Sequence, residues 1–113
     1  MAGYEVVHFD TLSPLSCPCG TTRRAFVDTS DAPASLHRVT IDNQARTHYH
    51  KQLTEIYYIL EGEGVMELDG ESVPVKPGSS ILIRPGCRHR AVGDMVILNV
   101  SIPRFDPSDE WFD

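Results

Sequence analysis

The chain has 113 residues, of which 41% are hydrophobic and 23% charged, and this balance is typical of a single globular domain with its own core. The formal net charge of -6 argues against nucleic acid as the main partner, because phosphate binding needs concentrated lysine and arginine. No apolar run approaches the roughly 18 residues of a membrane span, and the first residues lack the pattern of a signal peptide, so we expect a cytoplasmic protein without a membrane partner.

We expect one domain over residues 1–113, divided into three parts. Residues 1–22 carry little periodicity and end in a stretch rich in proline, cysteine and glycine, which predicts an N-terminal arm or loop. Residues 23–103 carry the strands of a barrel. Residues 104–113 form an acidic tail whose carboxylates we expect to be solvated.

Three cysteines, an odd number, do not suggest a disulfide framework. Cys17 and Cys19 flank one proline and would supply only two ligands to a soft metal, so a separate zinc site would need two more. A loop with buried or partly exposed thiols is the plainer interpretation. Cys87 stands two residues before His89, but turn geometry would normally send it outward, which argues against a ligand or nucleophile.

From residue 23 onward the sequence predicts short strands and no helix. The runs alternate or are rich in β-branched and aromatic residues, and Gly, Pro, Asp and Asn separate them. Asp69-Gly70 between two alternating runs is a strong hairpin signal. This punctuation favours a β-sandwich or a small barrel. The predicted strands cover residues 24–28, 35–41, 55–60, 65–69, 72–75, 80–83, 89–92 and 95–102.

The pair His48 and His50 predicts one side of a metal site. Side chains alternate faces along a strand, so both imidazoles point the same way with Tyr49 opposite. Glu55 can reach that face if the chain turns through residues 51–54 and resumes as a strand. Two nitrogens and a carboxylate are typical of a divalent-metal site.

His89 completes the predicted ligand set. It follows a turn with Pro85 and Gly86 and opens a short strand, so folding would bring a third imidazole to the other three ligands. A single histidine on a strand is more often a hydrogen-bonded surface or core residue, and we interpret His8 and His37 in that way.

The spacing of these residues resembles the first motif of the cupins, which are small double-stranded β-helix or jelly-roll barrels. That motif, roughly G-x5-H-x-H-x4-E-x6-G, runs here from His48 and His50 through Glu55 to Gly62. Asp42 stands where the leading glycine is expected.

The second cupin motif, roughly G-x5-P-x-G-x2-H-x3-N, also has a counterpart. It runs from Gly78 through Gly86 to His89, with Arg84 in place of the first proline and Gly93 in place of the asparagine. The resemblance covers about residues 36–103 and implies an all-β cupin barrel. It further implies that the four ligands lie inside the barrel and leave one or two coordination positions for water or substrate.

The resemblance implies one divalent transition metal per chain, and the ligand set does not choose among Fe, Mn, Ni, Co, Cu and Zn. It also implies a homodimer. An exposed barrel face with Ile56, Tyr58 and Leu60, and the N-terminal arm, would both benefit from a partner chain.

Strand parity predicts the neighbours of the metal. If Glu55 faces inward, so do Tyr57 and Ile59; if His89 does, so does Ala91. We therefore expect Tyr57 as a catalytic residue and Asn99, Ala91 and Ile59 as substrate-binding residues.

Some of these assignments have plainer alternatives. Tyr57 could simply fill space and donate a hydrogen bond, and a one-residue slip would turn Asn99 to solvent. Arg23 and Arg24 could hold an anionic substrate or a neighbouring chain's carboxylate, but an exposed pair is the default.

The expected function is that of a metalloenzyme acting on a small oxygenated molecule, of the dioxygenase, isomerase, lyase or cyclase type. The alternative is a non-catalytic module that binds a small molecule or a metal. The intact ligand quartet favours chemistry over binding alone.

Overall fold

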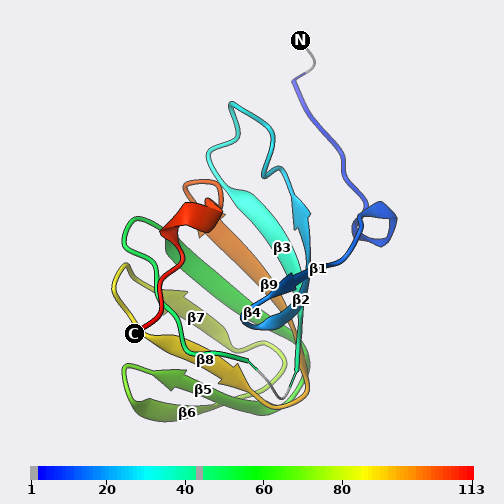
Figure 1. Ribbon diagram of the computed structural model, residues 1–113. Helices are drawn as coiled ribbons and strands as arrows, with labels where there is room; N and C mark the ends of the chain where they lie inside the picture. Colours follow the sequence, from blue (N-terminus) through cyan, green and yellow to red (C-terminus); the bar gives the residue numbers. More distant parts are fainter. Residues whose placement is uncertain (1–2, 43–44) are drawn as a thin grey trace.

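The computed structural model describes residues 3–42 and 45–113 and folds them into an all-β barrel of antiparallel strands (Figure 1). No helix in these residues is long and apolar enough to cross a membrane. The strands are β1 (Leu15–Cys17), β2 (Gly20–Ala25), β3 (Ser35–Ile41), β4 (Thr54–Gly62), β5 (Gly64–Leu68), β6 (Glu71–Val75), β7 (Ser80–Ile83), β8 (His89–Val92) and β9 (Met95–Ile102). Two short 3-10 turns, η1 (Phe9–Thr11) and η2 (Pro107–Asp109), lie near the ends of the chain.

Two sheets make up the barrel. One sheet has six strands in the order β1-β2-β3-β9-β4-β7, and the other has three in the order β6-β5-β8 (Figure 1). The chain passes from the large to the small sheet after Gly62, whose φ is 82° and where a Cβ atom would meet the Asp94 carbonyl oxygen at 2.0 Å. Only glycine fits this close approach, so Gly62 is needed for the crossing.

Side chains alternate between the core and the surface, as the sequence predicts. On β4, Glu55, Tyr57 and Ile59 are buried while Ile56 and Tyr58 are exposed. On β9 every second residue from Met95 to Ser101 is buried. The predicted alternation of inward and outward side chains is therefore confirmed on both β4 and β9.

The register of the large sheet arranges the inward side chains in rows, since directly paired residues share a face. Two neighbouring rows consist mainly of polar side chains, and the next row along the strands is almost wholly apolar. The barrel therefore has a polar end and an apolar end. These rows are Ser35–Ser101–Glu55–Ile83, Arg24–His37–Asn99–Tyr57 and Thr22–Val39–Ile97–Ile59.

The N-terminal part differs from the prediction. The predicted strand at 24–28 instead ends at Ala25, because Phe26 adopts a φ of 68°, outside the extended region. Strand β1 and the start of β2 fall within residues 1–22, which were expected to be an arm or loop.

The expectation of free thiols at Cys17 and Cys19 is wrong. The two residues are joined by a disulfide, with their Cα atoms 5.2 Å apart. The tight turn between β1 and β2 brings both side chains to the same place, within the normal range for such a bond.

The expectation of a solvated acidic tail is wrong for Asp109, which is only 7% exposed. Its carboxylate accepts hydrogen bonds of 2.9 Å from the backbone N–H groups of Lys51, Gln52 and Leu53. These N–H groups lie in the turn before β4, where a carboxylate supplies the acceptors that a buried donor needs. Asp106 and Asp113 are exposed, as expected.

Other contacts hold the last residues of the chain against residues 46–53. Tyr49 and Trp111 exchange backbone hydrogen bonds of 3.0 and 2.9 Å, and Arg46 stacks on the Phe112 ring at 3.8 Å. The last residues thus line up beside residues 46–53, and the red end of the chain packs on the barrel in Figure 1.

The Asp109→Asn variant should lower the free energy of unfolding by about 1–3 kcal/mol, because an amide NH2 group would face N–H donors that now meet an oxygen. Urea unfolding monitored by tryptophan fluorescence measures the change. Asp106→Asn is the matched control and should shift stability by less than about 0.5 kcal/mol, since asparagine caps a turn as well as aspartate. Equal midpoints for the two variants would contradict the role of Asp109.

Candidate metal centre

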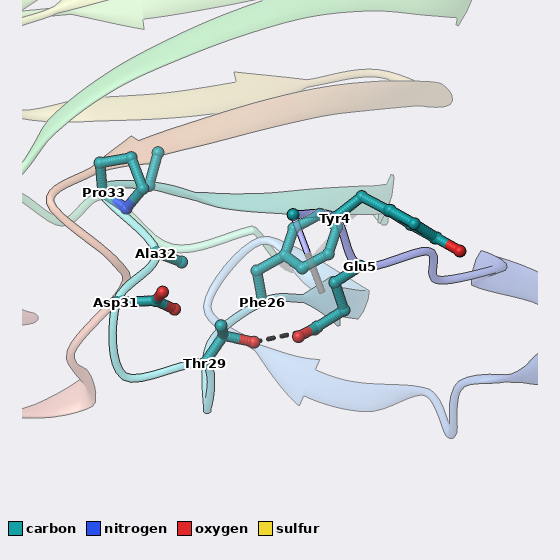
Figure 2. A pocket seen from close by; sticks show the side chains of 9 residues that line it. Tyr4, Glu5, Phe26, Thr29, Asp31, Ala32 and Pro33 are labelled. Carbon is teal, nitrogen blue, oxygen red and sulfur yellow. Dashed lines mark hydrogen bonds between the residues drawn. The ribbon is translucent and has the colours of Figure 1, made fainter. Parts of the chain in front are cut away.

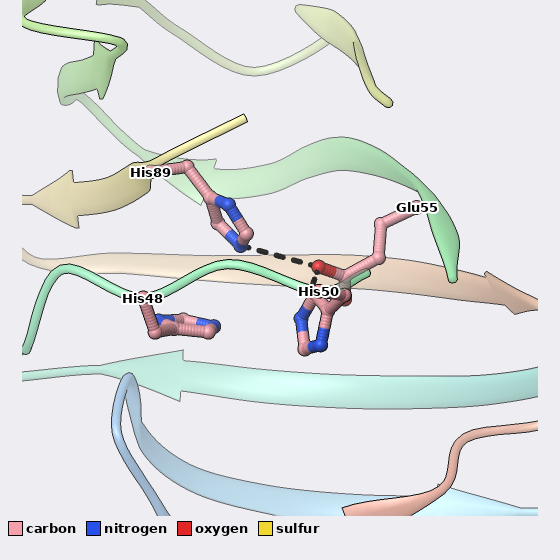
Figure 3. Close-up of side chains that lie close together, drawn as sticks. All are labelled: His48, His50, Glu55 and His89. Carbon is pink, nitrogen blue, oxygen red and sulfur yellow. Dashed lines mark ion pairs between the residues drawn. The ribbon is translucent and has the colours of Figure 1, made fainter. Parts of the chain in front are cut away.

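The four residues predicted as metal ligands meet inside the barrel. His48, His50, Glu55 and His89 are all buried, and each offers a ligand atom within 4.8 Å of the others. Figure 3 shows His50 and His89 pointing toward the Glu55 carboxylate, with His48 beside them; the quartet comes from three parts of the chain, since His48 and His50 share one segment. The structure thus brings together the whole predicted quartet.

Backbone pairing places the histidines. His48 and His89 exchange backbone hydrogen bonds of 3.2 and 2.9 Å, and the Gly86 N–H donates to the His50 carbonyl at 2.7 Å. The Pro-Gly turn before β8 is therefore fixed against the segment that carries the first two ligands. The imidazole centroids of His48 and His89 are 4.4 Å apart as a result.

Each histidine has its tautomer fixed by a backbone carbonyl. The Nδ1 atoms of His48, His50 and His89 donate to the carbonyl oxygens of Arg46, Asp109 and Cys87, at 2.9, 2.7 and 2.9 Å. A carbonyl oxygen can only accept, so the proton of a neutral ring sits on Nδ1 and the lone pair on Nε2. Metal-binding histidines commonly have this arrangement.

The lone pairs converge on one carboxylate oxygen. Glu55 Oε1 lies 2.9 Å from His50 Nε2 and 3.2 Å from His89 Nε2. These are ion-pair distances, yet all three atoms are buried without a hydrogen bond of acceptable geometry. Buried acceptors facing one another repel unless a cation or a proton lies between them. This donor set fits a divalent metal ion.

The ionisation of the site agrees with cation binding. Burial lowers the pKa of His48 to about 4, so its ring is neutral at pH 7. Burial alone would raise the pKa of Glu55, but the nearby rings of His50 and His89, which favour the charged carboxylate when they carry a proton on Nε2, outweigh burial and hold that pKa well below its usual range. Glu55 is therefore a carboxylate that needs positive charge beside it.

Asn99 orients Glu55 from the opposite side. Its Nδ2 donates to Glu55 Oε2 at 2.6 Å, while its Oδ1 is buried without a partner. Asn99 was predicted as a substrate contact on strand parity. Its observed contact is with the ligand carboxylate, and such second partners tune metal affinity.

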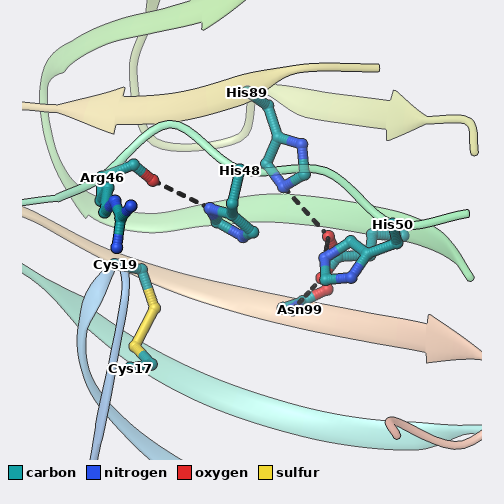
Figure 4. The surroundings of a disulfide bond; sticks show 8 residues. Cys17, Cys19, Arg46, His48, His50, His89 and Asn99 are labelled. Carbon is teal, nitrogen blue, oxygen red and sulfur yellow. Dashed lines mark hydrogen bonds and ion pairs between the residues drawn. A yellow bond between two sulfur atoms is a disulfide. The ribbon is translucent and has the colours of Figure 1, made fainter. Parts of the chain in front are cut away.

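A narrow cavity opens beside the quartet. Its free volume is about 20 Å³, enough for a water-sized group, so a larger ligand requires side chains at its mouth to move. The disulfide forms part of its wall near His48 (Figure 4). The cavity is lined by Cys17, Cys19, Thr22, Arg24, His37, Val39, His48, His50, Glu55, Tyr57, Asn99, Phe105 and Glu110.

The other predicted site residues lie at different depths. Tyr57 lines the cavity and packs edge-on against the His89 ring, with centroids 5.9 Å apart. Burial raises the pKa of Tyr57 well above its usual value, so its phenol stays protonated. Ala91 and Ile59 face inward but belong to the apolar core and not to the cavity wall. Their contact with a substrate stays a prediction that this placement does not favour.

Several residues that line the cavity are not predicted from the sequence. His37, expected as a hydrogen-bonded surface or core histidine, is 3% exposed and forms a 2.8 Å hydrogen bond with the Ser35 hydroxyl through Nε2, as expected, but it also lines the cavity. Its parity with Val39 on β3 was a usable signal for this inward position. Glu110 gave no such signal, because only the docked tail brings it there.

Cys87 is not part of the ligand cluster, in agreement with the sequence interpretation. It is half-buried and packs against the core instead of pointing fully outward, and burial raises the pKa of its thiol.

A larger surface hollow of about 460 Å³ lies between the N-terminal segment and the loop after β2 (Figure 2). Glu5 and Asp31 are its acidic residues, and Glu5 accepts a 2.8 Å hydrogen bond from Thr29. No histidine or cysteine lines it. Within the described residues, this hollow therefore offers no cluster of metal-ligating side chains like the buried quartet.

The chain is similar to a known family and to several solved structures. Residues 35–100 match the family model of the cupin domain, and no curated protein matches the chain. A protein from Planctomyces limnophilus is 38% identical, with 98% of each chain covered and a TM-score of 0.91. Streptomyces PAC13 with uridine is 22% identical over 97% of this chain and 90% of its own, with a TM-score of 0.83. Ectoine synthase from P. lautus is 22% identical over 96% and 88%, with a TM-score of 0.78.

The resemblances at 22% identity show a shared fold. The family match is stronger, because it spans more than half of the chain and contains the whole ligand quartet. The antiparallel barrel agrees with the predicted cupin architecture. The chain therefore belongs to the cupin domain family.

Proposed function

We propose that this protein is a metalloenzyme that holds one divalent transition metal per chain and acts on a small oxygenated molecule. His48, His50, Glu55 and His89 would be the ligands. The observation that carries the proposal is the convergence, in a buried site, of histidine lone pairs on one carboxylate oxygen, Glu55 Oε1, that has no hydrogen-bond partner. Iron, manganese, nickel, cobalt, copper and zinc all suit this ligand set.

A bound metal would supply a Lewis acid for a substrate oxygen. The residues of the chain supply the rest of the site. Tyr57 lines the cavity, and its protonated phenol would donate a hydrogen bond or a proton to a molecule bound there. Asn99 holds Glu55 in place, and the core below the cavity keeps bulk water out.

The similar structures include enzymes, but they do not choose a reaction for this chain. Pac13 is described as a nucleoside dehydratase, and another neighbour is an ectoine synthase; each is under 25% identical, so each shows the fold alone. The dioxygenase, isomerase, lyase and cyclase types all remain within the proposal.

A non-catalytic metal-binding module is the second candidate. The small free volume of the cavity, about 20 Å³, favours it, because a module that only binds metal needs no space for a substrate.

Two further expectations belong to this proposal. We propose that residues 1–113 act as one domain, because β1 and the docked tail both contact the barrel. We also propose a cytoplasmic location, and the disulfide between Cys17 and Cys19 is the feature that bears against it, since reducing compartments disfavour such bonds.

Replacing His48 and His50 together with alanine should reduce bound metal from about one equivalent to below about a tenth, because half of the ligands are lost. Elemental analysis of the purified protein measures this. The exposed His8 gives the control, His8→Ala, which should keep its metal. Stoichiometric metal in the double variant would rule out the proposed site.

Turnover distinguishes the two candidate functions. The metal-loaded protein should convert at least one member of a panel of diketones, keto-acids and sugars, with oxygen-dependent loss of substrate marking a dioxygenase. Tyr57→Phe should then lower kcat about 100-fold or more at unchanged metal content, if the phenol moves a proton. No turnover with any member, under air or nitrogen, would favour the binding module.

We also propose a homodimer through the outer face of the large sheet. Four apolar residues are paired neighbours across this face: Leu36, Val100, Ile56 and Leu82. The exposed fractions of Ile56 and Leu82 are 37% and 50%. An apolar row on an uncovered sheet is typical of a subunit contact.

Leu82→Asp should convert a dimer to a monomer at micromolar concentration in gel filtration with light scattering, because a carboxylate would be buried in the contact. Val73→Asp places the same charge on the small sheet and should leave the dimer intact. A wild-type monomer at this concentration would refute the proposal.

A further inference from the structure

We infer that the cavity has a second pole that binds an anion, and that its ligand carries a carboxylate held by Arg24. This deepens the proposed function, since the metal quartet would take an oxygen at the other pole of the same ligand. The sequence alone predicts Arg23 and Arg24 to be an exposed pair. The structure separates the two residues.

The sheet register turns Arg24 inward. On β2 it pairs with His37, and His37 pairs with Asn99 on β9, so the three side chains share the face that forms the cavity wall. Arg23 takes the opposite face, where its Nη1 donates to the Phe9 carbonyl at 3.1 Å. The two adjacent arginines therefore have different environments.

The side chain of Arg24 is held in place by its neighbours, but no ion pair neutralises its charge in the part of the chain that the structure describes. Its guanidinium lies over the Phe105 ring, 4.3 Å from the centroid, which fixes its plane. Its Nε is buried and has no hydrogen-bond partner. None of the ion pairs formed by the described residues includes Arg24. A guanidinium does not lose its proton in proteins, so this is a partly buried cation with an unused donor.

The groups around Arg24 do not complete its hydrogen bonding. Burial lowers the pKa of His37 to about 4, so that ring is neutral at pH 7. Glu110 also lines the cavity, and its charge acts on Arg24 without direct contact. Glu55 is occupied by Asn99 and the histidines. A donor is thus left for a ligand.

The ligand that matches this donor is a small carboxylate. Guanidinium N–H groups bind carboxylates in a planar fork, with two hydrogen bonds. Either a carboxylate or a phosphate would require side chains at the mouth of the cavity to move, so it is the planar match to the guanidinium that favours a carboxylate. With a divalent cation at the quartet, the positive charges in the cavity would outweigh the carboxylates of Glu55 and Glu110, and an anionic ligand would be favoured.

The test follows the Arg24 Nε–H resonance in 15N-correlated spectra while acetate is added, with acetamide as the neutral molecule of the same shape. Acetate should shift the resonance saturably and acetamide should not. Arg24→Gln should weaken acetate binding at least about tenfold, because a charge-assisted pair is lost. In this variant the binding is followed on the amide signals of neighbouring residues. Arg23→Gln is the matched control and should bind acetate as the wild type does.

The variants are also checked for folding by the dispersion of their spectra. If Arg24→Gln does not fold, Arg24→Lys keeps the charge without the fork and should bind acetate several-fold more weakly than the wild type. The titration is repeated in the metal-free protein with His48 and His50 replaced by alanine. Acetate binding there supports the Arg24 pole even if the proposed metal function fails. Equal shifts with acetamide, unchanged binding after Arg24→Gln, or preference for inorganic phosphate would overturn the inference.

Discussion

The repulsion between buried lone pairs around Glu55 is the constraint on which the site depends. His50 Nε2 and His89 Nε2 both approach Glu55 Oε1, and none of these atoms has a hydrogen-bond partner. In a dry interior this arrangement is stable only with positive charge between the atoms. The backbone carbonyls that accept from Nδ1 enforce it, because they prevent the rings from turning their protons inward.

The barrel supports this site through its division into polar and apolar rows. The apolar row with Ile97 and Ile59, both fully buried, packs at one end, and the polar rows lie at the other. The same antiparallel register serves both ends, since each strand contributes every second residue to the interior. The apolar core and the polar site thus lie at different positions along the same strands, and not in different parts of the chain.

The C-terminal residues connect the site to the surface of the barrel. Asp109 accepts from the turn before β4 through its carboxylate and from His50 through its carbonyl. Glu110, the next residue, lines the cavity. This short segment therefore orients His50, one of the candidate metal ligands, and also contributes charge to the cavity. The C-terminal tail is thus a part of the candidate metal centre.

The sequence by itself determined the strands from residue 35 onward, the family resemblance and the four candidate ligands. These depend on local patterns: alternation with a period of two, Gly and Pro at turns, and the spacing of His48 and His50. For this reason the predicted strands at 80–83, 89–92 and 95–102 have the observed bounds. The predicted strand through the two histidines is wrong, since the structure gives their segment only isolated bridges, but both still reach the site.

Only the tertiary structure decided which distant residues meet the ligands. The pairing of β2 with β3 turned Arg24 toward the cavity and Arg23 away, a choice that a one-residue change in the strand position would reverse. The disulfide is local and depends on the turn between β1 and β2. The burial of Asp109, in contrast, depends on contacts between two segments that are short, irregular and without periodicity. Local patterns carry no information about such contacts, because their energy arises only when the two segments are brought together.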